Sequence, residues 1–185
     1  MSAPASVTHT VSFIVGNGMS EMYPYPLIRG GGLFLTIIGA MIIAGALLPR
    51  ARNILVAAGL AFASIVTAIA APRLAHPLGT PSWLQILVLV GSVLLEIILI
   101  QVVVRYVYHL GERTIILSVL LVVGLHFLPM AVAFGPIIAI LGILTVLNAG
   151  AGLWLKPNMN LSILWFFDGV LKLACGIIMM VLVLT

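Results

Sequence analysis

The chain has 185 residues, of which 63% are hydrophobic and only 6% are charged. A soluble globular domain carries about 25% charged residues, so this composition excludes an ordinary water-exposed surface. The apolar runs are also too long for core helices. We therefore expect an all-α, polytopic transmembrane helical bundle.

Residues 1–26 are expected to form an arm at the outer surface of the membrane. Their apolar piece, residues 11–15, is too short to cross a bilayer, because a spanning helix needs about 20 residues. Tyr23 and Tyr25 would lie at the level of the lipid headgroups. No basic stretch precedes an apolar core here, so we do not expect a signal peptide.

Residues 27–185 are expected to form one transmembrane domain of six helices. Prolines, glycines and single basic residues divide this part of the chain into runs long enough to cross a bilayer. Because the connections are short, consecutive helices are predicted to be antiparallel neighbours. The predicted spans are residues 27–48, 53–71, 82–108, 114–134, 136–155 and 161–185.

The distribution of Lys and Arg predicts how these spans are oriented. Loops rich in basic residues face the cytoplasm, and six spans put both termini on one side. The terminal side holds only Arg29 and Arg73, whereas the loops after the first, third and fifth spans hold Arg50, Arg52, Arg105, Arg113 and Lys156. We therefore predict that these three loops are cytoplasmic and that both termini lie outside.

The net charge of +4 does not indicate a nucleic-acid partner. The basic residues stand singly at helix ends, whereas nucleic-acid-binding proteins gather them into a patch or stripe. The expected partners are the lipid bilayer and a small ion or solute.

Small-residue faces pack helices closely in lipid, within the chain or in a homo-oligomer. One such face in the second span consists of Gly59, Ala63, Thr67 and Ala71.

Several polar residues lie inside the predicted spans, where ionisable side chains are costly and rare. Asp168 and Lys172 are four residues apart with the acid first, which is the favourable order on a helix. A rise of 1.5 Å per residue places Asp168 about 11 Å and Glu96 about 14 Å from the cytoplasmic side. We expect the polar groups to face the bundle interior and to line an ion or substrate path. The set is Glu96, His126, Asn148, Asp168 and Lys172.

The charged members of this set allow more than one interpretation. Asp168 and Lys172 either neutralise each other and only orient the helix, or form a site that exchanges protons. Glu96 either binds a proton or cation, or serves as a partner for Lys172. Two acids and one lysine leave one negative charge, which a proton, a cation or His126 would neutralise.

His126 lies three residues before Pro129. The proline ring clashes with the carbonyl of Leu125, so we expect the helix to kink there. The freed carbonyl and the imidazole would form a pore or pocket wall; otherwise, His126 is hydrogen-bonded between helices. The other histidines lie in loops or at helix ends. Because paired-His, HExxH and CxxC spacings are absent, we expect no catalytic residue, no metal and no cofactor.

The Gly-Leu-His-Phe-Leu-Pro-Met-Ala segment at residues 124–131 resembles one in small bacterial six-span inner-membrane proteins of unknown function. This resemblance implies a bacterial inner (plasma) membrane and no known chemistry. Asp168-Gly-Val-Leu-Lys172 also resembles the Asp-x-x-x-Lys of microbial rhodopsins, whose lysine carries retinal. Those proteins have seven spans, and their third helix holds an Arg-Tyr-x-Asp-Trp pattern. Here Arg105-Tyr106 falls at a helix end, and Tyr108 takes the place of the aspartate.

These observations favour a small transporter or channel for an ion or small solute. One version of this hypothesis couples the transport to protons. In that hypothesis, protonation of Glu96 or His126 alternates with substrate binding near Lys172. The alternative is a non-transporting accessory or structural membrane protein whose polar groups only fix helix packing. A retinal-binding protein is a remote third option. An enzyme is not expected, because no nucleophile–base or metal constellation is recognisable.

Overall fold

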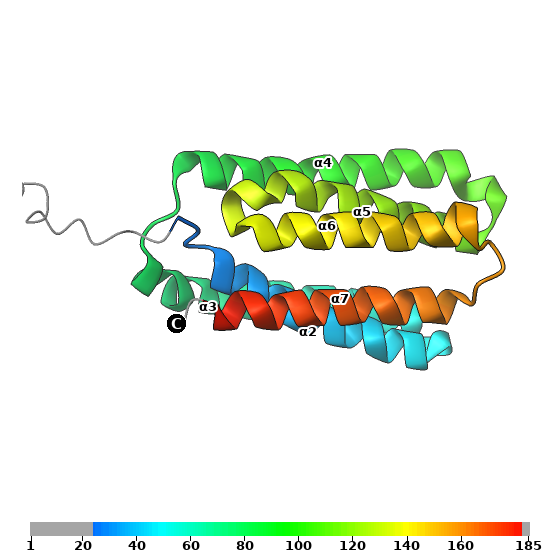
Figure 1. Ribbon diagram of the computed structural model, residues 1–185, viewed down its shortest axis with the longest axis horizontal. Coiled ribbons are helices and arrows are strands. Elements are labelled where there is room, and N and C mark those ends of the chain that lie inside the picture. The colour runs from blue at the N-terminus through cyan, green and yellow to red at the C-terminus, as the bar shows by residue number, and fades with distance from the viewer. Residues whose placement is uncertain (1–23, 183–185) are drawn as a thin grey trace, which may run out of the picture.

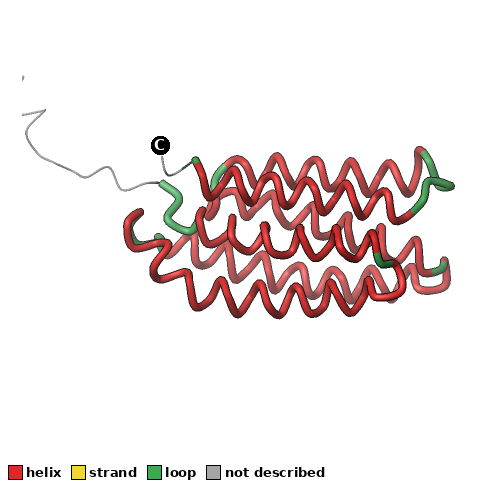
Figure 2. The backbone as a smooth tube through the Cα atoms, turned by 90° about the horizontal axis from the view of Figure 1, so that it is seen from below, coloured by secondary structure: helices red, strands yellow, loops and turns green. Residues whose placement is uncertain are grey.

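The computed structural model describes residues 24–182, and six helices in this range are long and apolar enough to cross a membrane. They run side by side along one axis, as the two views in Figures 1 and 2 show. The fold is therefore the predicted all-α bundle. The helices are α2 (Ile28–Leu47), α3 (Arg52–Ala75), α4 (Trp83–Val107), α5 (Glu112–Phe134), α6 (Pro136–Gly150) and α7 (Leu161–Val181).

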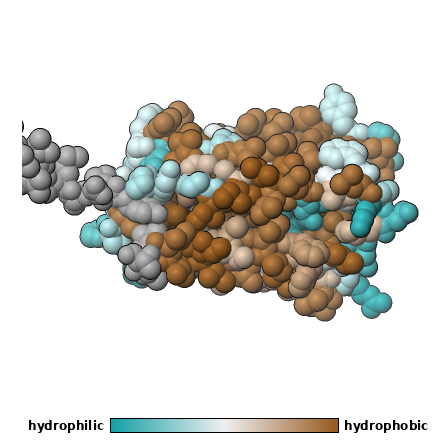
Figure 3. Space-filling view, viewed as in Figure 1, coloured by the Kyte–Doolittle hydropathy of each residue, from teal (hydrophilic) through white to brown (hydrophobic). Residues whose placement is uncertain are grey.

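The surface of the bundle has the polarity of a multi-pass membrane protein. On the face shown in Figure 3, hydrophobic residues cover the middle and hydrophilic residues gather toward the ends. A bilayer requires this pattern, because its hydrocarbon core offers no partner for polar groups.

One predicted helix end is wrong, whereas the fifth span ends at Leu155 as predicted. α3 continues through Pro72 to Ala75 instead of ending at Ala71. A proline removes one hydrogen bond, but leaving the helix would free several backbone groups near the membrane. The α-helical part of the fifth span ends at Gly150, and residues 151–155 form one turn of π-helix. Its backbone bond runs over 2.8 Å from the N–H of Lys156 to the carbonyl of Ala151.

The six helices divide into two groups of three, which Figure 1 shows as two layers. In the first group, α2 packs against both α3 and α7, and in the second, α5 packs against both α4 and α6. Contacts between the groups are fewer, and most of them join α6 to α7. The two groups are therefore the main packing units of the bundle.

α3 and α4 are consecutive in the sequence but do not pack as neighbours, so the predicted pairing is wrong for these two helices. They lie at opposite edges of the bundle (Figure 1), and the place beside α2 is taken by α7. Instead, α2 lies between α3 and α7 in the first group, and α4 packs against α5 in the second.

α2 and α7 meet backbone to backbone at two pairs of glycines. A Cβ added at Gly39 would lie 2.5 Å from the backbone nitrogen of Leu173 and 2.8 Å from the carbonyl oxygen of Gly169. A Cβ at Gly32 would lie 2.7 Å from the carbonyl oxygen of Gly176. In lipid, such close approach supplies the van der Waals packing that holds helices together. We call these four glycines the α2–α7 seam.

The predicted small-residue face of α3 also packs against α2. Gly59 and Ala63 are buried. A Cβ at Gly59 would lie 2.6 Å from the Cβ of Met41, so this position too needs a residue without a side chain. This face is therefore used within the chain.

The two ends of the described chain lie at the same end of the bundle, as six spans require (Figure 1). The basic residues predicted for the cytoplasmic side lie at the opposite end, in the connections or in the adjoining ends of the helices: Arg50, Arg52, Arg105, Arg113 and Lys156. Which end faces the cytoplasm stays a prediction from these charges.

Only the end of the predicted arm can be compared with the structure, because residues 1–23 lie outside the described residues. The side-chain amide of Gln85, in the first turn of α4, donates to the carbonyl of Pro24 over 2.8 Å. It also approaches the carbonyl of Val132 on α5 at 3.4 Å. Pro24, at the end of the predicted arm, is therefore hydrogen-bonded to α4 of the second helix group.

Gly39→Ala should lower the free energy of unfolding by about 1–3 kcal/mol, because the new Cβ meets backbone atoms that cannot move aside. The matched control is Gly91→Ala on α4, where no atom lies within 4 Å of an added Cβ. There alanine should leave stability unchanged or raise it by about 1 kcal/mol. Thermal unfolding of the purified protein in detergent measures both, and equal effects would contradict the seam.

Candidate functional site

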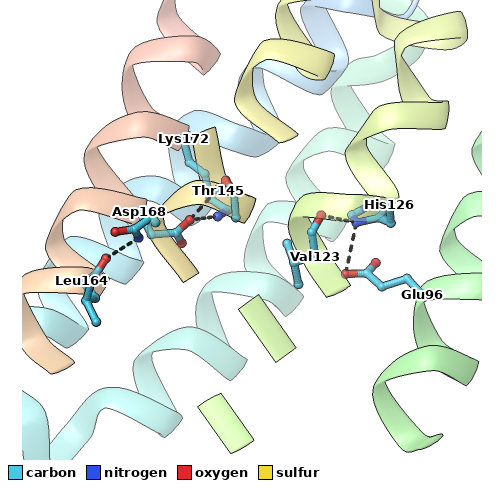
Figure 4. A network of polar contacts seen from close by, with 8 residues as sticks. Glu96, Val123, His126, Thr145, Leu164, Asp168 and Lys172 are labelled. Atoms are coloured by element: carbon cyan, nitrogen blue, oxygen red, sulfur yellow. Dashed lines mark hydrogen bonds and ion pairs between the residues drawn. The ribbon is translucent and has the colours of Figure 1, made fainter. Parts of the chain in front are cut away.

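Four of the five predicted site residues form two acid–base pairs within the bundle (Figure 4). Asp168 and Lys172 pair along α7, in the first helix group. Glu96 of α4 pairs with His126 of α5, in the second helix group. Each group of helices therefore contributes one pair, rather than all four residues forming one cluster.

The Asp168–Lys172 pair is almost completely buried. The Lys172 ammonium donates to Oδ1 of Asp168 one turn away, and the two residues are 3% and 2% exposed, respectively. The hydroxyl of Thr145 on α6 approaches the same carboxylate oxygen at 3.5 Å. The ammonium also lies 5.7 Å from the ring centre of Phe127 on α5, within cation–π range. Side chains from both helix groups thus surround the pair.

The Glu96–His126 pair lies between α4 and α5 and is less completely buried. Nδ1 of His126 is 3.4 Å from Oε1 of Glu96, and the two side chains are 7% and 19% exposed. The same Nδ1 lies 2.8 Å from the carbonyl oxygen of Val123, one turn earlier on α5. The direct partner of Glu96 is therefore His126 and not Lys172.

The two pairs influence each other electrostatically. Lys172 is close enough for its positive charge to act on both Glu96 and His126. Phe127 contacts each side, since its ring centre lies 4.5 Å from that of His126 and 5.7 Å from the Lys172 ammonium. A change of charge in one pair is therefore felt by the other.

Asn148 lies beside the charged groups but is not bonded to them. Its side-chain amide donates to the carbonyl of Leu164 over 2.9 Å and so joins α6 to α7 one turn before Asp168. Thr145, one turn away on the same face of α6, makes the contact with Asp168. Sequence reasoning missed Thr145. Its signal is its spacing from Asn148, since residues three apart share one face of a helix.

Pro129 lies inside α5, which continues unbroken from Glu112 to Phe134. Pro129 and Leu125 are exposed on the outer side of α5, whereas His126 is buried. The side chains of Pro129 and His126 thus lie in different environments: Pro129 is on the exposed outer face of α5, and His126 faces α4.

The groups that the site offers are two carboxylates, one imidazole and one ammonium. All four are acids or bases. In residues 24–182, no three His, Cys, Asp or Glu side chains come together closely enough to hold a metal ion.

Comparison with known proteins gives one match. No curated protein and no solved structure matches the chain. The family of unknown function DUF6609 matches residues 18–184, a range that includes all six helices and both acid–base pairs. The chain therefore belongs to the family of unknown function DUF6609.

Proposed function

We propose that this protein is a small proton-linked transporter of the bacterial inner membrane, and not an enzyme. The observation that carries the proposal is the placement of the two acid–base pairs. Each pair belongs to a different helix group, and the Asp168–Lys172 pair of one group contacts Thr145 and Phe127 of the other, through Asp168 and Lys172 respectively. Ionisable groups inside a membrane are costly and typically mark the path of an ion, a proton or a substrate.

The packing of the helices supports movement at this place. Contacts within each group of three helices are extensive, while contacts between the groups are few and fall mainly between α6 and α7. Many transporters work by rocking one helix bundle against the other around a site near the middle of the membrane. The boundary between the groups, where Asp168 meets Thr145, is where such rocking would open the site alternately to each side.

The charge balance supports coupling to protons. Asp168 and Lys172 neutralise each other, whereas Glu96 faces an imidazole that carries no charge unless it is protonated. An uncompensated carboxylate is unfavourable in a low-dielectric interior. Uptake of one proton by the Glu96–His126 pair removes this charge. Because Lys172 acts electrostatically on that pair, the same uptake would change how Lys172 holds a solute.

A second candidate function is that of a non-transporting accessory membrane protein. One observation favours it: Asp168 and Lys172 are closed on each other within a single helix and are nearly inaccessible. In that case, the polar groups would only fix helix packing, and removing them would change stability but no flux.

Glu96→Gln should lower proton flux by about 100-fold or more, because a positioned proton-transfer group contributes at least that much. The measurement is the decay of a pH gradient in liposomes that contain the purified protein, with thermal unfolding as the check on folding. Glu112→Gln, at the exposed start of α5, is the matched control and should leave flux unchanged. Normal flux in a folded Glu96→Gln variant, or none in the wild type, would rule out the proposal.

Asp168→Asn alone should destabilise the protein by about 3–5 kcal/mol, since it leaves the Lys172 ammonium buried without its counter-charge. The double variant Asp168→Leu with Lys172→Met removes both charges and should recover most of that loss. Unfolding in detergent measures the stabilities. If the protein is a transporter, liposomes that contain the stable double variant should show no more flux than empty liposomes. If the double variant instead transports at the wild-type rate, the role of Asp168 and Lys172 is limited to helix packing.

A further inference from the structure

We infer that His126 keeps its hydrogen on Nδ1 and takes up the transported proton on Nε2, with Glu96 as the counter-charge. This inference rests on the proposed function and deepens it, because it names the atom that binds the proton. It follows from the partners of one ring nitrogen, which Figure 4 shows between Val123 and Glu96.

The first step is the contact between His126 and its own helix. Nδ1 lies 2.8 Å from the carbonyl oxygen of Val123, a normal hydrogen-bond distance. A carbonyl oxygen only accepts, so Nδ1 must be the donor and must carry a hydrogen. In the neutral ring, the other nitrogen, Nε2, is then unprotonated and has a free electron pair. The helix backbone thus selects the tautomer.

The second step is the position of Glu96. Its Oε1 lies 3.4 Å from the same Nδ1, so the carboxylate is on the side of the ring that already has its hydrogen. A proton that binds to the electron pair of Nε2 creates an imidazolium, whose positive charge spreads over both nitrogens. Glu96 stabilises this charge from the far side of the ring. Enzymes use the same division, in which a carboxylate orients one nitrogen and the other takes the proton.

The proton balance is simple. A hydronium ion or a protonated solute gives up a proton: its own bond to that hydrogen breaks, the new N–H bond forms at Nε2, and water or the deprotonated solute leaves. Of the charged groups in the described part of the chain, Glu96 on α4 and Lys172 on α7 are those that act on His126. Glu96 carries the charge opposite to that of an imidazolium, and Lys172 carries the same charge.

The tautomer is measured by nitrogen NMR on the full-length protein in lipid nanodiscs, with ¹⁵N-labelled histidine. The His126 signals are those that disappear in His126→Asn. At a pH where the ring is neutral, we expect a protonated Nδ1 and a bare Nε2, the opposite of the tautomer that free histidine prefers. The pattern should persist in Glu96→Gln, because Val123 selects it. A bare Nδ1 in the wild type would overturn the inference.

Proton flux tests the role of Nε2. His126→Asn places an amide N–H near the position of Nδ1 but has no counterpart of Nε2, so flux should fall by about 100-fold or more. His76→Asn, at the exposed end of the bundle, is the matched control and should transport normally. Folding of both variants is checked by thermal unfolding.

The outcomes separate this inference from the proposed function. If Glu96→Gln abolishes flux while His126→Asn transports at the wild-type rate, the proton bypasses Nε2, and the inference is wrong although the protein is a transporter. If wild-type protein moves no protons, the proposed function fails, whichever nitrogen carries the hydrogen. If both variants lose flux and Nε2 is bare, the inference holds.

Discussion

The burial of the Asp168–Lys172 pair depends on the close contact between α2 and α7. Gly169 follows Asp168 directly, and a Cβ there would lie 2.7 Å from the side chain of Ile43 and 2.9 Å from its backbone nitrogen. α2 can therefore cover one side of α7, while Thr145 of α6 covers another. Lipid offers no polar partner, so a charged pair is tolerated there only when protein surrounds it. A residue larger than glycine would separate the helices and bring lipid toward the charges.

The division into two helix groups gives the two acid–base pairs different properties. The α7 pair is formed within one helix, so it persists wherever that helix moves. The Glu96–His126 pair is formed between two helices and depends on how α4 lies against α5. The first is suited to a fixed charge balance, and the second to a variable one. Lys172 connects them, because its charge acts across the boundary between the groups.

The helices and the polar residues can be predicted from the sequence because their signals are local: long apolar runs, prolines, glycines and isolated charges. The pairing of the polar residues is not local. The sequence allows Glu96 to lie beside Lys172 or His126, and the structure selects His126 because α4 packs against α5. Chain order also cannot show that α2 packs against α7, or that α3 and α4 do not pack against each other. Thr145 carries no charge to mark it, and only its neighbour Asn148 indicates its face.

The α2–α7 seam has a consequence for the mechanics of the bundle. On each helix the two glycines are seven residues apart, and the antiparallel contacts match Gly32 to Gly176 and Gly39 to Gly169. Sliding by one residue would press a side chain against the opposite backbone at both places at once, so the two helices are locked lengthwise. α6 and α7 instead meet through side-chain hydrogen bonds from Asn148 and Thr145. Asp168 thus lies between one contact that is fixed by backbone atoms and another that is made by side chains.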